Sequence, residues 1–408
     1  MKNNLLHLVL LLVLSACAQN EAAPIEDGTQ QQSTTAQAQD YFEHKVQAEY
    51  AQHFELSYHG NYKLVKTDAT FYPNGKQEEG KSRQDIIVLV QKGTEAPPLT
   101  GALQDAQVVF IPIDKVAVNV QHSESFLREL GLVERINTIG GLYSFDDTMR
   151  NKALNGELGQ VGYSWHSPPN IEVLLERQPE VFLMTLASMD HTQSLEKCRQ
   201  LGIPTVAVFD WAEQDYLARA EWVKFYSLFF NAEEQANIVF QEIANRIDEL
   251  KALAAEAPEE SALWGYYTSK SKWLVQLSNF PAQYMRDANL KNVLLGQVEA
   301  NANGSQQLSS EQLLILGQEA EHWVIGDIHG APLPQETIMS SFQAWNSGQL
   351  YHNMKRVDPK SNTSDWYATA IVRPDTVLAD LIKLAHPELL PDHHPVFMGV
   401  FDKETALN

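Results

Sequence analysis

The side chains of this 408-residue sequence that could carry out chemistry are scattered along the chain. There is no Gly-x-Ser-x-Gly turn for a nucleophilic serine, no His-Glu-x-x-His helix for a catalytic metal and no glycine-rich phosphate loop. Asp146 and Asp147 are adjacent, which is more typical of a turn or a helix cap than of paired catalytic carboxylates. We therefore predict that the protein is not an enzyme. Catalytic turnover would favour the alternative, an exported enzyme.

Histidines are the remaining candidates for metal chemistry. His122, His166, His191 and His329 fall in predicted loops, but they are far apart in the sequence and no loop is rich in histidine. A zinc site needs three or four ligands from histidine, cysteine or carboxylate side chains. We predict no metal site formed by side chains alone, and direct binding of a metal ion remains an alternative hypothesis.

Two glutamates occupy matched positions in the two halves of the chain. Asn170 precedes Glu172 by two positions, and Ser309 precedes Glu311 by two; a leucine pair and a core strand follow in both cases. Each glutamate is expected in the first turn of a helix, where the helix dipole and unpaired N–H groups favour a carboxylate. The repetition also suggests a second role, because a symmetric partner could receive the two carboxylates with two arginines.

The first 17 residues have the form of an export signal. Lys2 precedes an apolar run from Leu5 to Leu14 that is too short to span a bilayer. The sequence Leu14-Ser15-Ala16-Cys17 resembles the cleavage box of a lipoprotein signal. We therefore predict lipid attachment at Cys17 and a location in the periplasm or at the outer face of the cell envelope.

Composition limits the partners. The net charge of -22 argues against nucleic acid, which selects basic surfaces, and the hydrophobic share of 44% is ample for a large core. Apart from Cys17 the chain has only Cys198, which we expect to be buried in a helix and unpaired. We expect a monomer.

The apolar pattern predicts an α/β protein with two Rossmann-like lobes, a single long helix joining them and a small N-terminal β-rich appendage. Strand and helix signals alternate in two regions, which favours largely parallel sheets. Residues 213–256 contain no Pro or Gly and carry helical spacing, with Asn231 as the cap of a continuous helix. The predicted divisions are 1–17 for the signal, 18–45 for a flexible tether, 46–104 for the appendage, 105–212 for the first lobe with a first strand at 108–111, 213–256 for the bridge and 257–400 for the second lobe.

The chain carries, in this order, Asn170-Ile171-Glu172 ahead of Gln178-Pro179-Glu180-Val181, then Ala220-Glu221-Trp222-Val223-Lys224-Phe225, Lys355-Arg356-Val357-Asp358-Pro359, Ile371-Val372-Arg373-Pro374-Asp375 and His386-Pro387-Glu388. Together these segments resemble the iron-siderophore and cobalamin binding proteins of ABC importers, and the resemblance covers roughly residues 105–395. It implies a clamshell of the helical-backbone class III, with the ligand between the lobes. It also implies a permease dimer with ATPase subunits as partner, with Glu172 and Glu311 as the docking glutamates.

The resemblance further implies a metal chelate as ligand and no cofactor of the protein's own. A ferric siderophore is favoured, and cobalamin or heme are alternatives. The ligand should lie at the loops that follow the strands of an open α/β sheet. The candidate ligand-binding residues are His122, Ser123, Tyr143, Tyr163, Trp165, His166 and Trp211 from the first lobe, and Lys270, Trp273, Asn303, His329, Trp366 and Tyr367 from the second.

Overall fold

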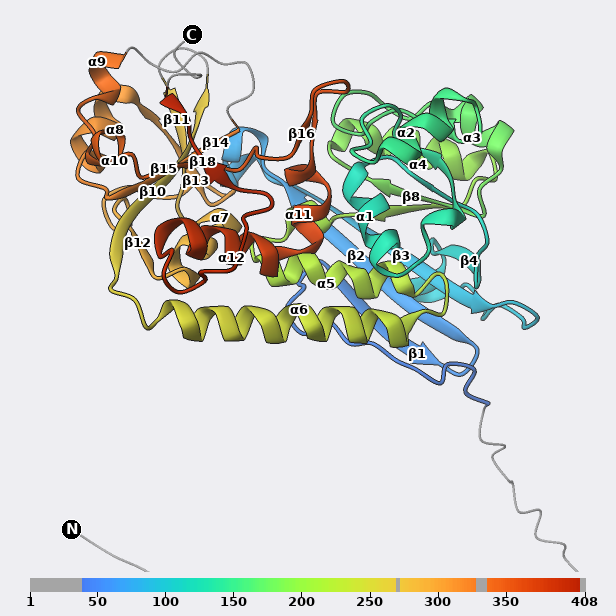
Figure 1. Ribbon diagram of the computed structural model, residues 1–408. Helices are drawn as coiled ribbons and strands as arrows, with labels where there is room; N and C mark the ends of the chain where they lie inside the picture. The colour runs from blue at the N-terminus through green and yellow to red at the C-terminus, as the bar shows by residue number, and fades with distance from the viewer. Residues whose placement is uncertain (1–38, 269–271, 328–335, 404–408) are drawn as a thin grey trace, which may run out of the picture. The chain divides into compact units, whose positions relative to one another are not determined.

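Five parallel strands form the sheet of the first lobe, in the order β7-β6-β5-β8-β9 (Figure 1). The computed structural model describes residues 39–268, 272–327 and 336–403 of the chain. Strands β8 and β9 consist of buried residues, as expected where helices cover both faces of a parallel sheet. The strands are β5 (Val116–Val118), β6 (Ile136–Ile139), β7 (Gly159–Gln160), β8 (Val181–Thr185) and β9 (Thr205–Val208), and the helices are α1 (Gln121–Glu129), α2 (Asp147–Leu154), α3 (Ile171–Arg177) and α4 (Thr192–Gln200).

The second lobe has a mixed sheet, in the order β13-β11-β10-β14-β15-β18 with β12 also paired to β10. Strand β10 pairs in parallel with β12 and β14 and antiparallel with β11. Its strands are β10 (Glu260–Thr268), β11 (Lys272–Gln276), β12 (Leu290–Asn292), β13 (Ser305–Ser309), β14 (His322–Gly326), β15 (Leu350–His352) and β18 (Gly399–Val400), and a separate pair is β16 (Val357–Asp358) with β17 (Thr363–Ser364). The helices are α7 (Phe280–Asp287), α8 (Ser310–Gly317), α9 (Glu336–Met339), α10 (Gln343–Ser347), α11 (Thr369–Val372) and α12 (Pro374–Ala385).

Two helices, α5 (Tyr216–Ser227) and α6 (Glu233–Ala254), connect the lobes. Every residue of α5 is buried, whereas α6 buries one face against α5 and α12 and spans about 33 Å at 1.5 Å per residue (Figure 1). The predicted cap at Asn231 is wrong. Asn231 adopts a left-handed conformation with φ 52°, Ala232 precedes α6 instead, and the Asn231 side chain accepts a hydrogen bond from Lys63 at 2.9 Å.

The β-rich N-terminal stretch forms a four-stranded sheet in the order β1-β2-β3-β4. The strands are β1 (Phe54–His59), β2 (Tyr62–Phe71), β3 (Lys81–Gln91) and β4 (Gln107–Ile111). The strand predicted at 108–111 was expected in the first lobe, but β4 pairs in parallel with β3 and completes this N-terminal sheet instead. The difference arises because an apolar strand pattern does not specify its pairing partner.

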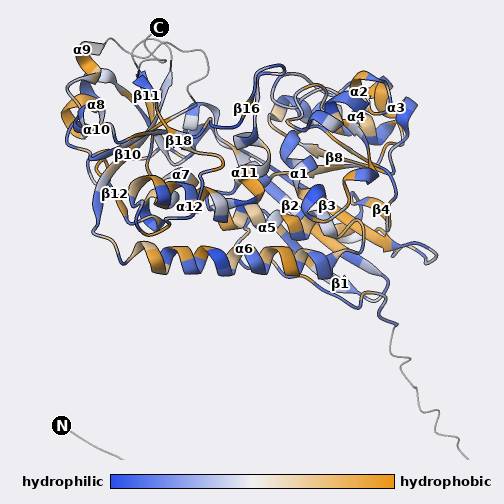
Figure 2. Ribbon diagram, viewed as in Figure 1, coloured by the Kyte–Doolittle hydropathy of each residue, from blue (hydrophilic) through white to orange (hydrophobic). Residues whose placement is uncertain are grey.

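Apolar residues concentrate in the strands and on one side of α6 (Figure 2). One core cluster runs from the N-terminal sheet through the first lobe and α5 into α12 of the second lobe. A second cluster, which includes Trp273 and Trp323, fills the other part of the second lobe. Helix α5 is therefore buried in a core that both lobes share, and this packing holds α5 in place between them.

Candidate ligand cavity

A cavity of about 750 Å³ lies where the two lobes and helix α5 meet. Ten aromatic rings line it, and Arg219 is its only lysine or arginine among the residues described. The volume is within the usual range for sites of small molecules and cofactors. Eight predicted ligand-binding residues line the cavity, namely His122, Tyr143, Tyr163, Trp165, His166, Trp211, Trp366 and Tyr367.

The first-lobe wall comes from segments that follow the parallel strands. His122 follows β5, Tyr143 follows β6, Tyr163 and His166 follow β7, and Trp211 follows β9. Carboxyl ends of parallel strands meet at one edge of a sheet, which is why these residues converge. The Tyr143 ring stacks on Tyr163 with centroids 5.1 Å apart and meets His166 at 4.6 Å. The wall is therefore a packed aromatic surface that a flat or bulky apolar ligand could contact.

Other predicted contacts lie elsewhere. Ser123 is inside α1, and its hydroxyl is 2.7 Å from the Tyr226 hydroxyl in the core. Trp273 packs against Trp323 in the second core cluster and is 1% exposed, and Asn303 is exposed in the loop before β13. None of the three lines the cavity. Cys17, Lys270 and His329 lie outside the described residues.

Sequence reasoning missed the parts of the cavity wall that α5, β10 and α7 supply. Tyr216 and Arg219 come from α5, Tyr266 from β10, and Phe280 and Tyr284 from α7. Helix α5 has no polar face, so each charge within it needs a buried partner or a cavity. The charged residues within this apolar helix were the signal available in the sequence, although they do not tell which charge faces the cavity.

Arg219 is the positive charge of the cavity. Its guanidinium lies 4.5 Å from the centre of the Phe280 ring, and its Nε has no hydrogen-bond partner among the described residues. Burial lowers the pKa of Arg219, while the negative charge of Asp210 opposes that shift. An arginine stays charged at physiological pH, so the site presents a cation whose Nε–H donor has no partner among the described residues.

Asp210 and His122 lie close together in the structure. Asp210 is fully buried, and its Oδ2 is 3.1 Å from His122 Nε2, although neither atom has hydrogen-bond geometry with any described group. Trp211 Nε1 also lacks a described partner. The cavity thus combines apolar rings with several unpaired polar atoms, the arrangement that fixes the orientation of a ligand.

Burial keeps four phenols of the cavity in their neutral form. Burial raises the pKa of Tyr163 to about 12, and burial likewise raises the pKa of Tyr216, Tyr266 and Tyr367. At neutral pH these hydroxyls donate hydrogen bonds and do not carry negative charge. Among the residues described, no three His, Cys, Asp or Glu side chains gather to hold a metal ion.

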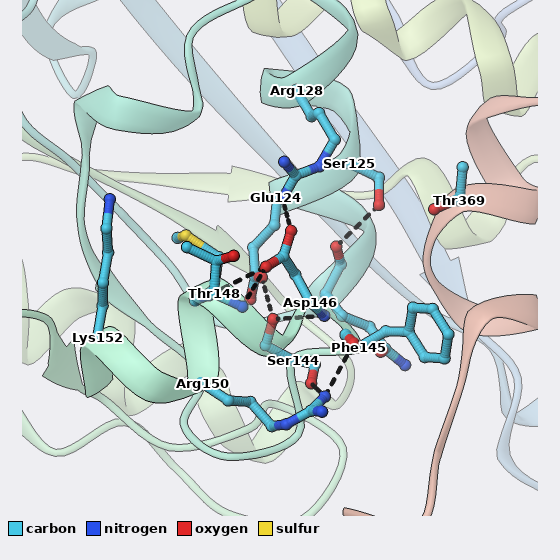
Figure 3. A network of polar contacts seen from close by, with 12 residues as sticks. Glu124, Ser125, Arg128, Ser144, Phe145, Asp146, Thr148, Arg150, Lys152 and Thr369 are labelled. Atoms are coloured by element: carbon cyan, nitrogen blue, oxygen red, sulfur yellow. Dashed lines mark hydrogen bonds and ion pairs between the residues drawn. The ribbon is translucent and has the colours of Figure 1, made fainter. Parts of the chain in front are cut away.

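A polar cleft of about 630 Å³ adjoins the aromatic cavity and shares Gln121 with it. Figure 3 shows its network, in which the Ser144 hydroxyl donates to Glu124 at 2.5 Å and Arg150 donates to the carbonyl oxygens of Ser144 and Phe145. Arg150 also pairs with Asp358 of the second lobe. The ion pair between Arg150 and Asp358 therefore links the lobes directly.

Glu124 should make stability depend on pH. Burial raises its pKa to about 8, with Asp146 adding to the shift and Ser144, Arg128 and Arg150 opposing it. Between the ordinary carboxyl pKa and about 8, the folded protein binds one more proton than the unfolded chain. The contribution of protonated Glu124 to the unfolding free energy is therefore complete at low pH and is lost as the pH rises through about 8. The wild type should lose on the order of 3 kcal/mol of unfolding free energy from pH 5 to pH 8.5 through this group.

Urea unfolding of Glu124→Gln at both pH values tests this prediction. The amide keeps a partner for Ser144 and does not titrate, so the loss between pH 5 and pH 8.5 should shrink. Glu134→Gln, which removes a mostly exposed carboxylate, is the control and should keep the wild-type dependence. Equal pH dependence in wild type and Glu124→Gln would contradict the assignment.

Both matched glutamates lie in first helical turns. Asn170 caps α3 by accepting from the Glu172 backbone N–H, and Ser309 caps α8 in a capping box with Gln312. Glu172 and Glu311 are exposed, and α3 and α8 belong to different lobes, both on the side away from α6 (Figure 1). Both lobes therefore place a glutamate two positions after a capping side chain, although the cap is Asn170 in one lobe and Ser309 in the other.

The comparisons with known proteins agree with this architecture. An uncharacterized lipoprotein of Methanocaldococcus jannaschii is 24% identical over 299 residues, which cover 69% of this chain and 67% of the relative. A structure from Staphylococcus epidermidis, described as a possible iron-binding, periplasmic solute-binding protein, has a TM-score of 0.52 at 13% identity and covers 68% of this chain and 100% of that chain. A periplasmic heme-binding protein of Vibrio cholerae has a TM-score of 0.51 at 13% identity and covers 67% of this chain and 99% of that chain.

Two α/β lobes around a shared cavity define a two-lobed solute-binding protein. Residues 116–352, more than half of the sequence, match the periplasmic binding protein family, and the chain belongs to that family. The family comprises solute-binding components of ABC importers, so the protein binds a solute and is not an enzyme. No helix in the described part of the chain is both long and apolar enough to cross a membrane.

Proposed function

We propose that the protein captures a metal chelate between its lobes and delivers it to an ABC permease dimer, with a ferric siderophore as the favoured ligand. The observation that carries this proposal is the cavity of about 750 Å³ with ten aromatic rings and one arginine. A cavity of this size suits a small molecule and not a bare metal ion, and the aromatic rings suit a bulky ligand with apolar faces. Among similarly folded proteins, one is described as a possible iron-binding protein and two as heme-binding proteins.

The polar atoms of the cavity indicate the charge of the ligand. Arg219 and the Trp211 indole both offer N–H donors that have no described acceptor. Donors of this kind are satisfied by the oxygen atoms of carboxylate, catecholate or hydroxamate groups. A chelate that arrives with its metal already coordinated can present such oxygens to Arg219 and its rings to the aromatic wall.

Quenching of tryptophan fluorescence tests the proposal. Trp165, Trp211 and Trp366 line the cavity, so a bound chelate should quench them. The panel should contain ferric catecholate and hydroxamate siderophores, cobalamin and hemin. Trp165 is 48% exposed, so Trp165→Phe should fold normally and show a smaller quench with the same ligand.

The pattern of responses distinguishes the ligands. Tight binding of a ferric siderophore supports the favoured ligand. Binding of cobalamin alone, or of hemin alone, would instead show that this compound and not a siderophore is the ligand. If no chelate quenches the fluorescence or raises the melting temperature, the chelate proposal is wrong.

Glu172 and Glu311 are the proposed contacts with the permease. An exposed aliphatic side chain follows each glutamate by about one turn: Leu175 is 44% exposed on α3 and Ile315 is 73% exposed on α8. Each lobe therefore presents one carboxylate and one apolar group on the same helix. A dimeric permease with a basic and an apolar contact in each half would match this arrangement. Cys17 is the proposed lipid attachment site, which agrees with the lipoprotein name of the relatives.

A further inference from the structure

We propose that the N-terminal sheet is a working part of the ligand site, because Phe71 positions the cavity residue Trp211 and the turn at 73–75 ties the sheet to the second lobe. This inference rests on the proposed ligand cavity. The family match begins at residue 116, after this sheet, so family membership does not account for it. The role follows from the contacts that the sheet makes with three other parts of the protein.

The sheet is joined to the edge of the first lobe through buried hydrogen bonds. Asp85 is 3% exposed and accepts from Arg199 at 2.7 Å and from the Ala207 backbone N–H at 2.9 Å. The Thr67 hydroxyl donates to the Ala207 carbonyl at 3.0 Å. The N-terminal sheet therefore satisfies both the N–H and the C=O of Ala207 in edge strand β9. Separating this sheet from β9 would leave buried polar groups without partners.

Strand β9 leads directly into the cavity wall. Three residues after it, Trp211 lines the cavity and meets Trp165 with centroids 6.2 Å apart. Phe71, the last residue of β2, lies behind Trp211 with centroids 5.1 Å apart and is 9% exposed. Since Phe71 does not line the cavity, it acts on the ligand only through Trp211 and is a positioning residue.

The turn after β2 reaches the second lobe. The Gly75 carbonyl accepts from the Ala302 backbone N–H at 3.1 Å, in the loop between β12 and β13. Gly75 has φ +71°, and an added Cβ would lie 2.6 Å from the side chain of Asn301. A side chain at this position is therefore excluded both by backbone conformation and by contact with the second lobe. The sheet thus connects the first lobe to the second independently of α5 and α6.

Phe71→Ala tests the positioning of Trp211. The affinity for the tightest chelate of the panel should fall about fivefold, because an aromatic contact of this kind is worth roughly 1 kcal/mol and the freed indole no longer keeps a single orientation toward the cavity. Phe342→Ala is the matched control, since Phe342 is 2% exposed and packs on Trp323 with centroids 4.5 Å apart, away from the cavity. Both variants should lower the melting temperature, but only Phe71→Ala should change affinity and quenching. Phe71→Leu, which fills more of the space, should restore part of the affinity.

Gly75→Ala tests the connection to the second lobe. Ligand dissociation measured by stopped flow should be several-fold faster, because the lobes are no longer held together at this point. Gly93→Ala is the control, because Gly93 also has a positive φ of +88° but has no atom within 4 Å of the added Cβ.

The outcomes separate this inference from the proposed function. If the wild type binds no chelate, the proposed function fails. If the wild type binds but Phe71→Ala weakens binding no more than Phe342→Ala, or Gly75→Ala releases ligand as slowly as Gly93→Ala, the role of the N-terminal sheet is overturned.

Discussion

Reversal of charge at both Glu172 and Glu311 to lysine is expected to abolish chelate uptake and leave chelate affinity unchanged. Both side chains are exposed and neither lines the ligand cavity, so the cavity should be unaffected. At the proposed contact, each lysine would face a positive charge of the permease, and such like-charge pairs cost several kcal/mol. Single reversals should retain part of the uptake, because one of the two contacts remains.

The control for this experiment is the double variant Glu176→Lys and Glu319→Lys. Glu176 is an exposed acid of α3, Glu319 is an exposed acid just after α8, and the net charge of the protein changes by the same amount. Uptake of metal-labelled chelate by cells that depend on this importer should fall only for the first pair. An equal fall in both double variants would mean that net charge matters and the two helix positions do not.

Arg219→Met is expected to weaken binding of anionic chelates by about 10- to 100-fold, since a hydrogen bond to a charged group contributes about 1.5–3 kcal/mol. Methionine keeps much of the apolar volume against Phe280 but removes the charge and the N–H donors. Arg219→Lys should give an intermediate loss, because the charge is kept and the planar guanidinium is not. A neutral chelate should be affected much less.

Titration of each variant with anionic and neutral members of the panel measures this effect. Arg286→Met is the matched control: its side chain is 70% exposed on α7 and does not line the cavity. Equal losses for anionic and neutral chelates in Arg219→Met would show that Arg219 supports the cavity only by packing.

The elements of the fold were largely predictable because their signals are local. Cys198 was expected to be buried in a helix and is buried in α4, and the two glutamates expected in first helical turns lie there in α3 and α8. The break between α5 and α6 was predicted only at its second end, through the cap assigned to Asn231. The end of α5 has no such signal, because residues 213–256 contain no Pro or Gly. Lys63 of the distant strand β2 fixes that break, by donating to the Leu228 carbonyl at 2.8 Å.

The site was predictable only in part, for a related reason. Aromatic residues after the strands of the first lobe were found, because carboxyl strand ends converge at one edge of a parallel sheet. The pattern does not tell which way a side chain points, so Trp273 and Ser123 were expected in the cavity but face the core. Arg219 was missed because it lies in a helix where every residue is buried, and only the packed structure shows that its charge borders a cavity.

The segment just before β1 has a mechanical consequence. The backbone N–H groups of residues 49–51 donate to the carboxylate of Glu221 in α5, and those of residues 52 and 53 donate to the carboxylate of Glu213. Glu213 also accepts a hydrogen bond from the indole N–H of Trp222 in α5. A pull on the chain at Gln39 should therefore act first, through these hydrogen bonds, on α5, the helix buried between the two lobes. Such a pull should leave the ligand cavity between the lobes unchanged.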